Sequence, residues 1–194
     1  MTTERLGVFG GTFDPVHVGH LVAAVNVRHE LTLDRVLFVV ANKPWQKGER
    51  VVAGADDRAA MVEAAVEDVA GLEVSRLELD RGGPSYTVDT LEPLAERGAE
   101  LFLIVGADAA ASIETWHRVD AVRRLATLVV VTRAGWEMPD LAPGWRVEQV
   151  SIPRLEVSST DLRQRLAEGR PVEFLIPPRA VRCLRDRGLY PDTG

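Results

Sequence analysis

Two histidines, His17 and His20, stand three residues apart directly after a glycine-rich turn. The preceding residues 6–9 form a short apolar run that predicts a strand, and a helix is expected to begin near Val18. A turn that joins a strand's carboxyl end to a helix N-terminus gathers free backbone N–H groups where an anion can bind. Both imidazoles would lie at that point, so a phosphate pocket is the first hypothesis.

The glycines of this segment have separate expected roles. Gly10 and Gly11 let the backbone turn and approach a ligand closely, and Gly19 leaves room in the first helical turn for both imidazoles. A His-x-x-His pair also suits a metal, but such a site wants a third ligand and this segment offers only Asp14. The pattern is neither the P-loop nor the dinucleotide-binding fingerprint, because neither glycine spacing occurs in the required place.

Composition limits the class of protein. The 194 residues are 46% apolar, which predicts a single globular domain spanning residues 1–194. The formal net charge of −6 argues against a general nucleic-acid binder, so any positive field for an anion must be local. The lone cysteine, Cys183, fits a reducing cytoplasm. No apolar run approaches the ~18 residues that a membrane span needs, so we expect a cytoplasmic protein without a membrane partner.

Strand-like and helix-like segments alternate along the chain, which predicts an α/β fold with an open parallel sheet and helices on both faces. Continuous β-branched runs such as residues 35–41 are typical of strands that are covered on both sides. The expected strands are residues 6–9, 35–41, 72–79, 101–105, 125–132 and 147–152. The expected helices are residues 18–31, 55–69, 88–97 and 177–190, with a short one before Trp116 and another that opens within residues 157–163.

A second candidate anion site lies at residues 157–163. Ser158, Ser159 and Thr160 stand where a helix would begin, and Asp161 follows Ser158 at a spacing like that of a capping box. Capping explains one hydroxyl. Three hydroxyls with Arg163 one turn further favour an anion site, because the guanidinium and the helix N-terminus would converge on one phosphate.

Other polar residues follow the carboxyl ends of expected strands. Asp108 could accept hydrogen bonds from ribose hydroxyls or simply cap a helix, and Thr87 is a plausible N-cap whose hydroxyl would then be structural. Residues 42–48 gather Lys43 and Lys47 around Trp45, as either a solvated loop or a ligand contact.

Two phosphate-compatible helix N-termini suit a polyphosphate, and a nucleoside triphosphate is the natural candidate. In an open parallel sheet, ligands bind beyond the strands' carboxyl ends, where all of these residues are expected. No serine, cysteine or lysine has a convincing base partner, so direct displacement at phosphorus is favoured over a covalent enzyme intermediate.

Residues 10–20 together with residues 157–163 resemble the paired signatures of the nucleotidyltransferase family with the His-x-Gly-His motif. Within that family, Ser85-Tyr-Thr87, Gly106-Ala-Asp108, Trp116 and residues 188–190 are similar to nicotinate-nucleotide adenylyltransferases, over nearly the whole chain. The resemblance implies a Rossmann-like nucleotidyltransferase fold. It also implies adenylyl transfer from ATP, carried with Mg²⁺, to nicotinate mononucleotide, giving deamido-NAD and pyrophosphate in NAD biosynthesis.

The resemblance implies roles for single residues as well. Three would be catalytic, namely His17, His20 and Arg163. ATP would be bound by Gly10, Gly11, Thr12, Phe13, Gly106, Asp108, Arg133, Ser158, Ser159 and Thr160. Nicotinate mononucleotide would be bound by Lys47, Tyr86, Thr87 and Trp116, and no residue is expected to serve as a resident metal ligand. The chain has Pro44-Trp-Gln-Lys47 where many relatives have Pro-Pro-His and a basic residue, so Lys47 preserves only the charge.

Other functions remain open at this level. The acceptor could be nicotinamide mononucleotide or phosphopantetheine, because the phosphate motifs are shared, and cytidylyl transfer is a related alternative. A regulatory module that binds ATP without turnover is an alternative from a different class. Intact His17, His20 and Arg163 argue against it, because a sensor needs no charge stabilisation in a transition state. A homo-oligomer is compatible with the sequence.

Overall fold

The computed structural model describes residues 3–44, 51–133 and 138–191. Within these ranges six parallel strands form one sheet in the order β3-β2-β1-β4-β5-β6. The strands are β1 (Arg5–Gly11), β2 (Arg35–Val40), β3 (Leu72–Ser75), β4 (Glu100–Gly106), β5 (Ala126–Arg133) and β6 (Val147–Ile152). The sequence prediction of an open parallel sheet is confirmed.

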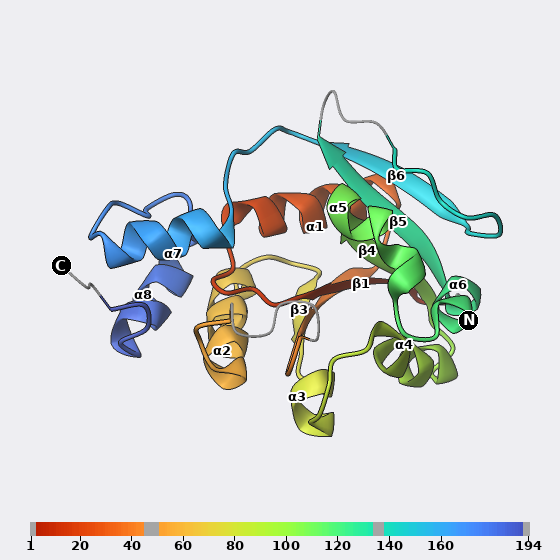
Figure 1. Ribbon diagram of the computed structural model, residues 1–194, viewed down its shortest axis with the longest axis horizontal. Coiled ribbons are helices and arrows are strands. Elements are labelled where there is room, and N and C mark those ends of the chain that lie inside the picture. The colour runs from red at the N-terminus through yellow and green to blue at the C-terminus, as the bar shows by residue number, and fades with distance from the viewer. Residues whose placement is uncertain (1–2, 45–50, 134–137, 192–194) are drawn as a thin grey trace.

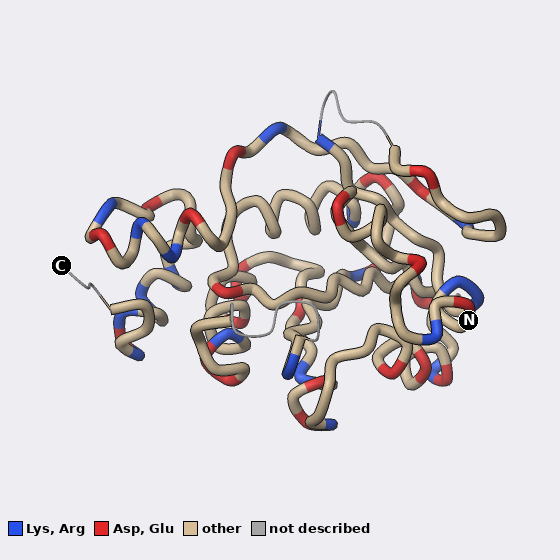
Figure 2. The backbone as a smooth tube through the Cα atoms, viewed as in Figure 1, with Lys and Arg blue, Asp and Glu red and all other residues tan. Residues whose placement is uncertain are grey.

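Helices connect the strands and cover both faces of the sheet (Figure 1). They are α1 (Val18–Glu30), α2 (Ala55–Val66), α3 (Leu77–Arg81), α4 (Thr87–Glu96), α5 (Ala107–Ala111), the 3₁₀ turn η2 (Ile113–Thr115), α6 (Val119–Leu125), α7 (Ser159–Ala167) and α8 (Pro178–Asp186). Helices α7 and α8 lie at the opposite end of the molecule from α6, and each carries more arginines than acidic residues (Figures 1 and 2).

Two apolar cores pack against the two faces of the sheet. The first holds buried residues of α1, α2, α7 and α8, and the second holds those of α4, α5, η2 and α6. Strand β2 contributes to both, because Val36 and Phe38 face the first core while Leu37 and Val39 face the second. This double burial explains the continuous apolar run of β2 that the sequence displays.

The strand expected over residues 72–79 is wrong beyond Ser75. Strand β3 ends at Ser75. It is an edge strand that pairs with β2 alone, and residues 77–81 form the short helix α3 although the sequence continues to alternate. Glu78 therefore lies in a helix and not in the strand, and it is buried with only 6% of its surface exposed. Two helices are also shorter than expected, since α2 ends at Val66 and α8 at Asp186, with Gly188 in the left-handed region at φ 61° closing α8.

Candidate active site

The site lies where the direction of strand addition reverses. From β1 the chain adds β2 and β3 on one side of the sheet and then β4, β5 and β6 on the other. In such sheets a crevice opens beyond the carboxyl ends of the two strands at the reversal. Here those ends are Gly10 and Gly11 of β1 and Gly106 of β4. A Cβ atom added at Gly10 or Gly106 would meet no atom within 4 Å, so free space adjoins both strand ends.

Two cavities share this crevice. The larger cavity has a volume of about 550 Å³ and the smaller cavity about 220 Å³, and residues 9–12, Gly106 and Ala109 line both. The larger cavity gathers the side chains or backbone of every expected catalytic and ATP-binding residue: Gly10, Gly11, Thr12, Phe13, His17, His20, Gly106, Asp108, Arg133, Ser158, Ser159, Thr160 and Arg163. Residues far apart in the sequence therefore form one wall.

The two imidazoles stack at the start of α1. The ring centroids of His17 and His20 lie 3.7 Å apart with 25° between the planes. The backbone N–H of His17 donates to Nδ1 of His20 at 3.2 Å, so the neutral His20 ring carries its proton on Nε2. A Cβ at Gly19 would lie 3.0 Å from Nδ1 of His17. Glycine at that position thus leaves room for the imidazole, as the sequence analysis expected.

The side chain of Phe13 packs between Gly11 and the imidazole of His20. The ring of Phe13 covers Gly11 so closely that a Cβ there would lie 2.6 Å from Cζ of Phe13. The same ring meets His20 edge to face at a centroid distance of 5.0 Å. Phe13 itself has φ 52°, in the left-handed region. The small residue and the turn together place an aromatic support behind the imidazole.

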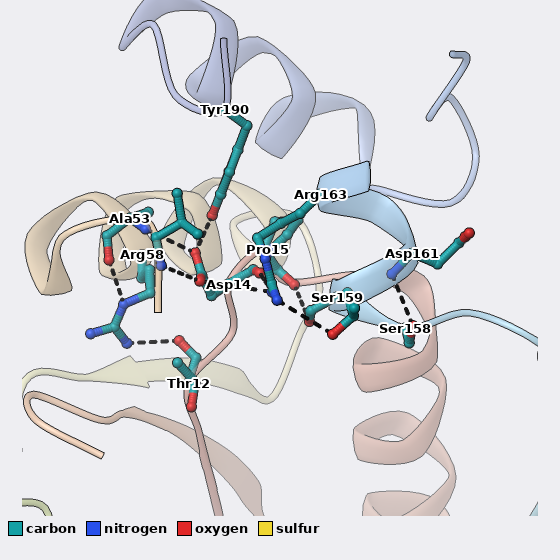
Figure 3. A network of polar contacts seen from close by, with 12 residues as sticks. Thr12, Asp14, Pro15, Ala53, Arg58, Ser158, Ser159, Asp161, Arg163 and Tyr190 are labelled. Atoms are coloured by element: carbon teal, nitrogen blue, oxygen red, sulfur yellow. Dashed lines mark hydrogen bonds and ion pairs between the residues drawn. The ribbon is translucent and has the colours of Figure 1, made fainter. Parts of the chain in front are cut away.

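Helix α7 is fastened to the segment that precedes α1 (Figure 3). The N-cap prediction is confirmed, since Oγ of Ser158 accepts from the backbone N–H of Asp161 at 3.1 Å. The hydroxyl of Ser159 donates to the carbonyl oxygen of Pro15 at 2.9 Å, and Arg163 donates to that of Asp14 at 2.6 Å. The N-termini of α1 and α7 therefore face one cavity, where both macrodipoles favour negative charge.

A buried polar network lies beneath this wall (Figure 3). Asp14, 3% exposed, accepts from the backbone N–H groups of Val52 and Ala53 at 2.8 and 3.1 Å and from the hydroxyl of Tyr190 at 2.5 Å. Burial is the larger cause and the hydrogen bond to Asp14 the next, and together they raise the pKa of Tyr190 far above its ordinary value. The carboxylate is thus engaged in holding the chain together, contrary to the role of third metal ligand considered from the sequence.

Arg58 completes the network. A charged residue on a covering helix normally faces solvent, yet the structure buries Arg58 with 1% of its surface exposed. Its guanidinium donates to the carbonyl oxygens of Ala53, Thr12 and Asn42 at 3.1, 2.7 and 3.3 Å. Burial lowers the pKa of this guanidinium. No pattern in the sequence marks a charged residue that bonds backbone carbonyls distant in the chain.

The smaller cavity lies on the α4 side of the crevice. Tyr86, Thr87 and Trp116 line it, as do Glu78 and Thr90, which the sequence analysis did not single out. Thr87 is the first residue of α4 and Tyr86 is the N-cap, so the expectation that the Thr87 hydroxyl caps the helix is wrong. The hydroxyl is left for other contacts. The expected ligand contact of Lys47 lies outside the described residues.

No group of three or more histidine, cysteine or acidic side chains that could hold a metal ion occurs within the described ranges. No helix in these ranges is long and apolar enough to cross a membrane.

A family model described as cytidylyltransferase-like matches residues 8–165, which include both candidate anion-binding segments. A probable nicotinate-nucleotide adenylyltransferase of Corynebacterium kroppenstedtii is 47% identical over 98% of this chain and 92% of its own length. Another, of Streptomyces coelicolor, is 47% identical over 93% of this chain and 98% of its own length. The chain belongs to the nicotinate-nucleotide adenylyltransferase family.

The fold of this family member agrees with solved structures. It matches Plasmodium falciparum nicotinic acid mononucleotide adenylyltransferase complexed with NaAD with a TM-score of 0.79, 16% identity, and coverage of 96% of this chain and 97% of that one. A putative nicotinate-nucleotide adenylyltransferase of Vibrio parahaemolyticus gives 0.70, 21% and 98% of each chain. The Rossmann-like nucleotidyltransferase fold implied by the sequence resemblance is confirmed.

Proposed function

We propose that this protein transfers the adenylyl group of ATP to nicotinate mononucleotide, giving deamido-NAD and pyrophosphate in NAD biosynthesis. The observation that carries this proposal is the pair of cavities that meet at the end of β1. The larger cavity, with two helix N-termini, suits a triphosphate, and the smaller, lined by Tyr86 and Trp116, suits an aromatic ring. Two nucleotides bound in this way bring their phosphates together at the shared wall of residues 10–12.

The reaction follows from charge and position. An oxygen of the acceptor's 5′-phosphate attacks the α-phosphorus of ATP, a new P–O bond forms, and the bond to the β-phosphate breaks to release pyrophosphate. Two anions must first be held together, so binding in one crevice removes much of the entropic barrier. Neutral His20 offers Nε2–H to the phosphate oxygens, while Arg163 and the N-terminus of α7 stabilise the charge that moves onto pyrophosphate.

We assign the remaining lining residues to particular parts of the two nucleotides. Ser158, Ser159 and Thr160 hold the outer phosphates, and Gly106, Asp108 and Arg133 lie towards the adenosine. Thr87 and the free N–H groups at the start of α4 receive the nicotinate carboxylate, while Trp116 lies against the ring. Asp14 has its carboxylate occupied by backbone and tyrosine donors, so Mg²⁺ enters with ATP as part of the substrate.

The function is tested by pyrophosphate release from ATP and Mg²⁺ with three separate acceptors. Nicotinate mononucleotide is expected to give a higher kcat/KM than nicotinamide mononucleotide, and phosphopantetheine is expected to give background release. Faster release with phosphopantetheine would contradict the acceptor assignment. ATP binding without release from any acceptor would instead favour a regulatory module.

We also infer that the chain works as a single domain, because the residues that line the two cavities come from Val8 to Arg163 and α8 packs into the same apolar core as α1, α2 and α7.

A further inference from the structure

Glu78 is a buried acid in the smaller cavity with one oxygen unused. Its Oε1 accepts a hydrogen bond from the hydroxyl of Thr90 at 2.7 Å. Its Oε2 is buried and has no hydrogen-bond partner within the described part of the chain. A buried carboxylate oxygen without a donor or a counter-charge costs folding free energy. Such a group is expected where a ligand supplies the missing interaction.

The charge balance of the smaller cavity indicates the sign of that ligand. Among the described residues that line it, Glu78 is the only acid, and neither lysine nor arginine is present. The rest of the lining is mainly apolar, aromatic or hydroxyl-bearing. A negative charge in a poorly solvated site attracts a cation far more strongly than it would in water. The cavity is therefore suited to a planar group that carries positive charge.

We infer that Glu78 faces the cationic ring of the acceptor nucleotide and selects acceptors whose ring nitrogen is quaternary. This inference rests on the proposed function, in which the acceptor is an N-ribosylated pyridine with a positively charged ring. The ring's own carboxylate is received at the N-terminus of α4, and Glu78 stabilises the opposite charge. Thr90 acts as a positioning residue, because its hydroxyl holds Oε1 and so determines where Oε2 lies.

The test compares nicotinate mononucleotide with its 1,4-dihydro form, whose ring nitrogen is uncharged. Glu78→Gln keeps an oxygen for Thr90 but removes the negative charge. It is expected to raise KM for nicotinate mononucleotide about tenfold, leave KM for ATP unchanged, and lower the preference for the charged ring by a similar factor. Asp80→Asn is the matched control, since it removes one acid from the same helix outside the lining of the smaller cavity. It should leave both KM values unchanged.

Two variants of Thr90 separate positioning from folding. Thr90→Val should raise KM for nicotinate mononucleotide, and Thr90→Ser should restore it, because serine keeps the hydroxyl donor. These two variants decide the matter if circular dichroism shows that Glu78→Gln does not fold.

A folded Glu78→Gln protein with unchanged KM and unchanged preference for the charged ring would overturn the inference, and so would an equal loss with Asp80→Asn. If wild-type protein releases no pyrophosphate with nicotinate mononucleotide, the proposed function fails. If wild-type protein releases pyrophosphate with nicotinate mononucleotide and Glu78→Gln changes neither KM nor the preference for the charged ring, only the role of Glu78 is refuted.

Discussion

Replacing Arg58 with methionine removes a buried guanidinium while keeping an unbranched side chain. Arg58 joins three separate segments, because it donates to the carbonyl oxygens of Thr12 after β1, Asn42 after β2 and Ala53 before α2. Methionine fills most of the space with apolar atoms, which limits the contribution of a cavity to the measured change. The loss therefore reports mainly on the three carbonyl oxygens that the guanidinium satisfies.

The expected loss of unfolding free energy follows from the lengths of the three Arg58 hydrogen bonds. Two of them, at 2.7 and 3.1 Å, are well formed, and each hydrogen bond to a charged group contributes about 1.5–3 kcal/mol. The third is long at 3.3 Å, and removing the charge also recovers the cost of its burial. We expect the free energy of unfolding to fall by about 3 kcal/mol. For a chain of this size that corresponds to a melting temperature lower by roughly 6–12 °C.

Urea and thermal unfolding followed by circular dichroism measure this change. Arg179→Met is the matched control, because Arg179 pairs with Glu67 and Asp68 at the surface, with 44% of its side chain exposed. Exposed ion pairs contribute about 0–1 kcal/mol, so this variant should unfold within that margin of wild type. Equal effects of the two substitutions would refute the assignment of Arg58 as the tie between the three segments.

Gly11→Ala should lower the free energy of unfolding by about 1–3 kcal/mol, because its Cβ would clash with the ring of Phe13. Gly10→Ala should unfold like wild type, because its Cβ enters open space, and it should lose ligand affinity, because that space is the cavity. Equal stability of the two alanine variants would contradict this packing. His20→Ala should lower kcat by about 10²–10³ and change ATP affinity far less, and equal losses would favour a binding module. The raised pKa of Tyr190 stabilises the fold below the ordinary tyrosine pKa of 10.0 and loses that contribution as the pH rises further, because the unfolded chain then releases a proton. Tyr190→Phe should flatten the alkaline slope of unfolding free energy against pH, and an unchanged slope would count against the buried bond. EDTA should stop turnover without lowering the melting temperature, and a lower melting temperature would indicate a resident structural metal.

Local periodicity and composition were enough to predict the sheet and the gathering of the two candidate anion-binding segments at one edge of it. Runs such as residues 35–41 show double burial directly, and the glycine turn before His17 marks a strand that leads into a helix. The N-cap at Ser158 is equally local, because the acceptor and the donor are three residues apart. Features of this kind depend on neighbours in the sequence and can be predicted from them.

The supporting network depends on contacts that no local pattern encodes. Asp14 and Tyr190 are 176 residues apart, and the partners of Arg58 lie in three different segments. A charged residue on an amphipathic helix is normally solvated, so the helical pattern of residues 55–69 does not indicate that Arg58 is buried. Glu78 was assigned to a strand because alternation of apolar residues cannot show where an edge strand stops pairing.

The two cavities share one strand end but are otherwise lined by different elements. The end of β1 is common to both, but the surrounding side chains belong to different elements: α1 and α7 on one side, and α3, α4 and Trp116 on the other. Under the proposed function, we therefore expect substitutions near Trp116 to alter the choice of acceptor and to leave the affinity for ATP unchanged. The two sides can thus be altered one at a time, because their described linings share only residues 9–12, Gly106 and Ala109.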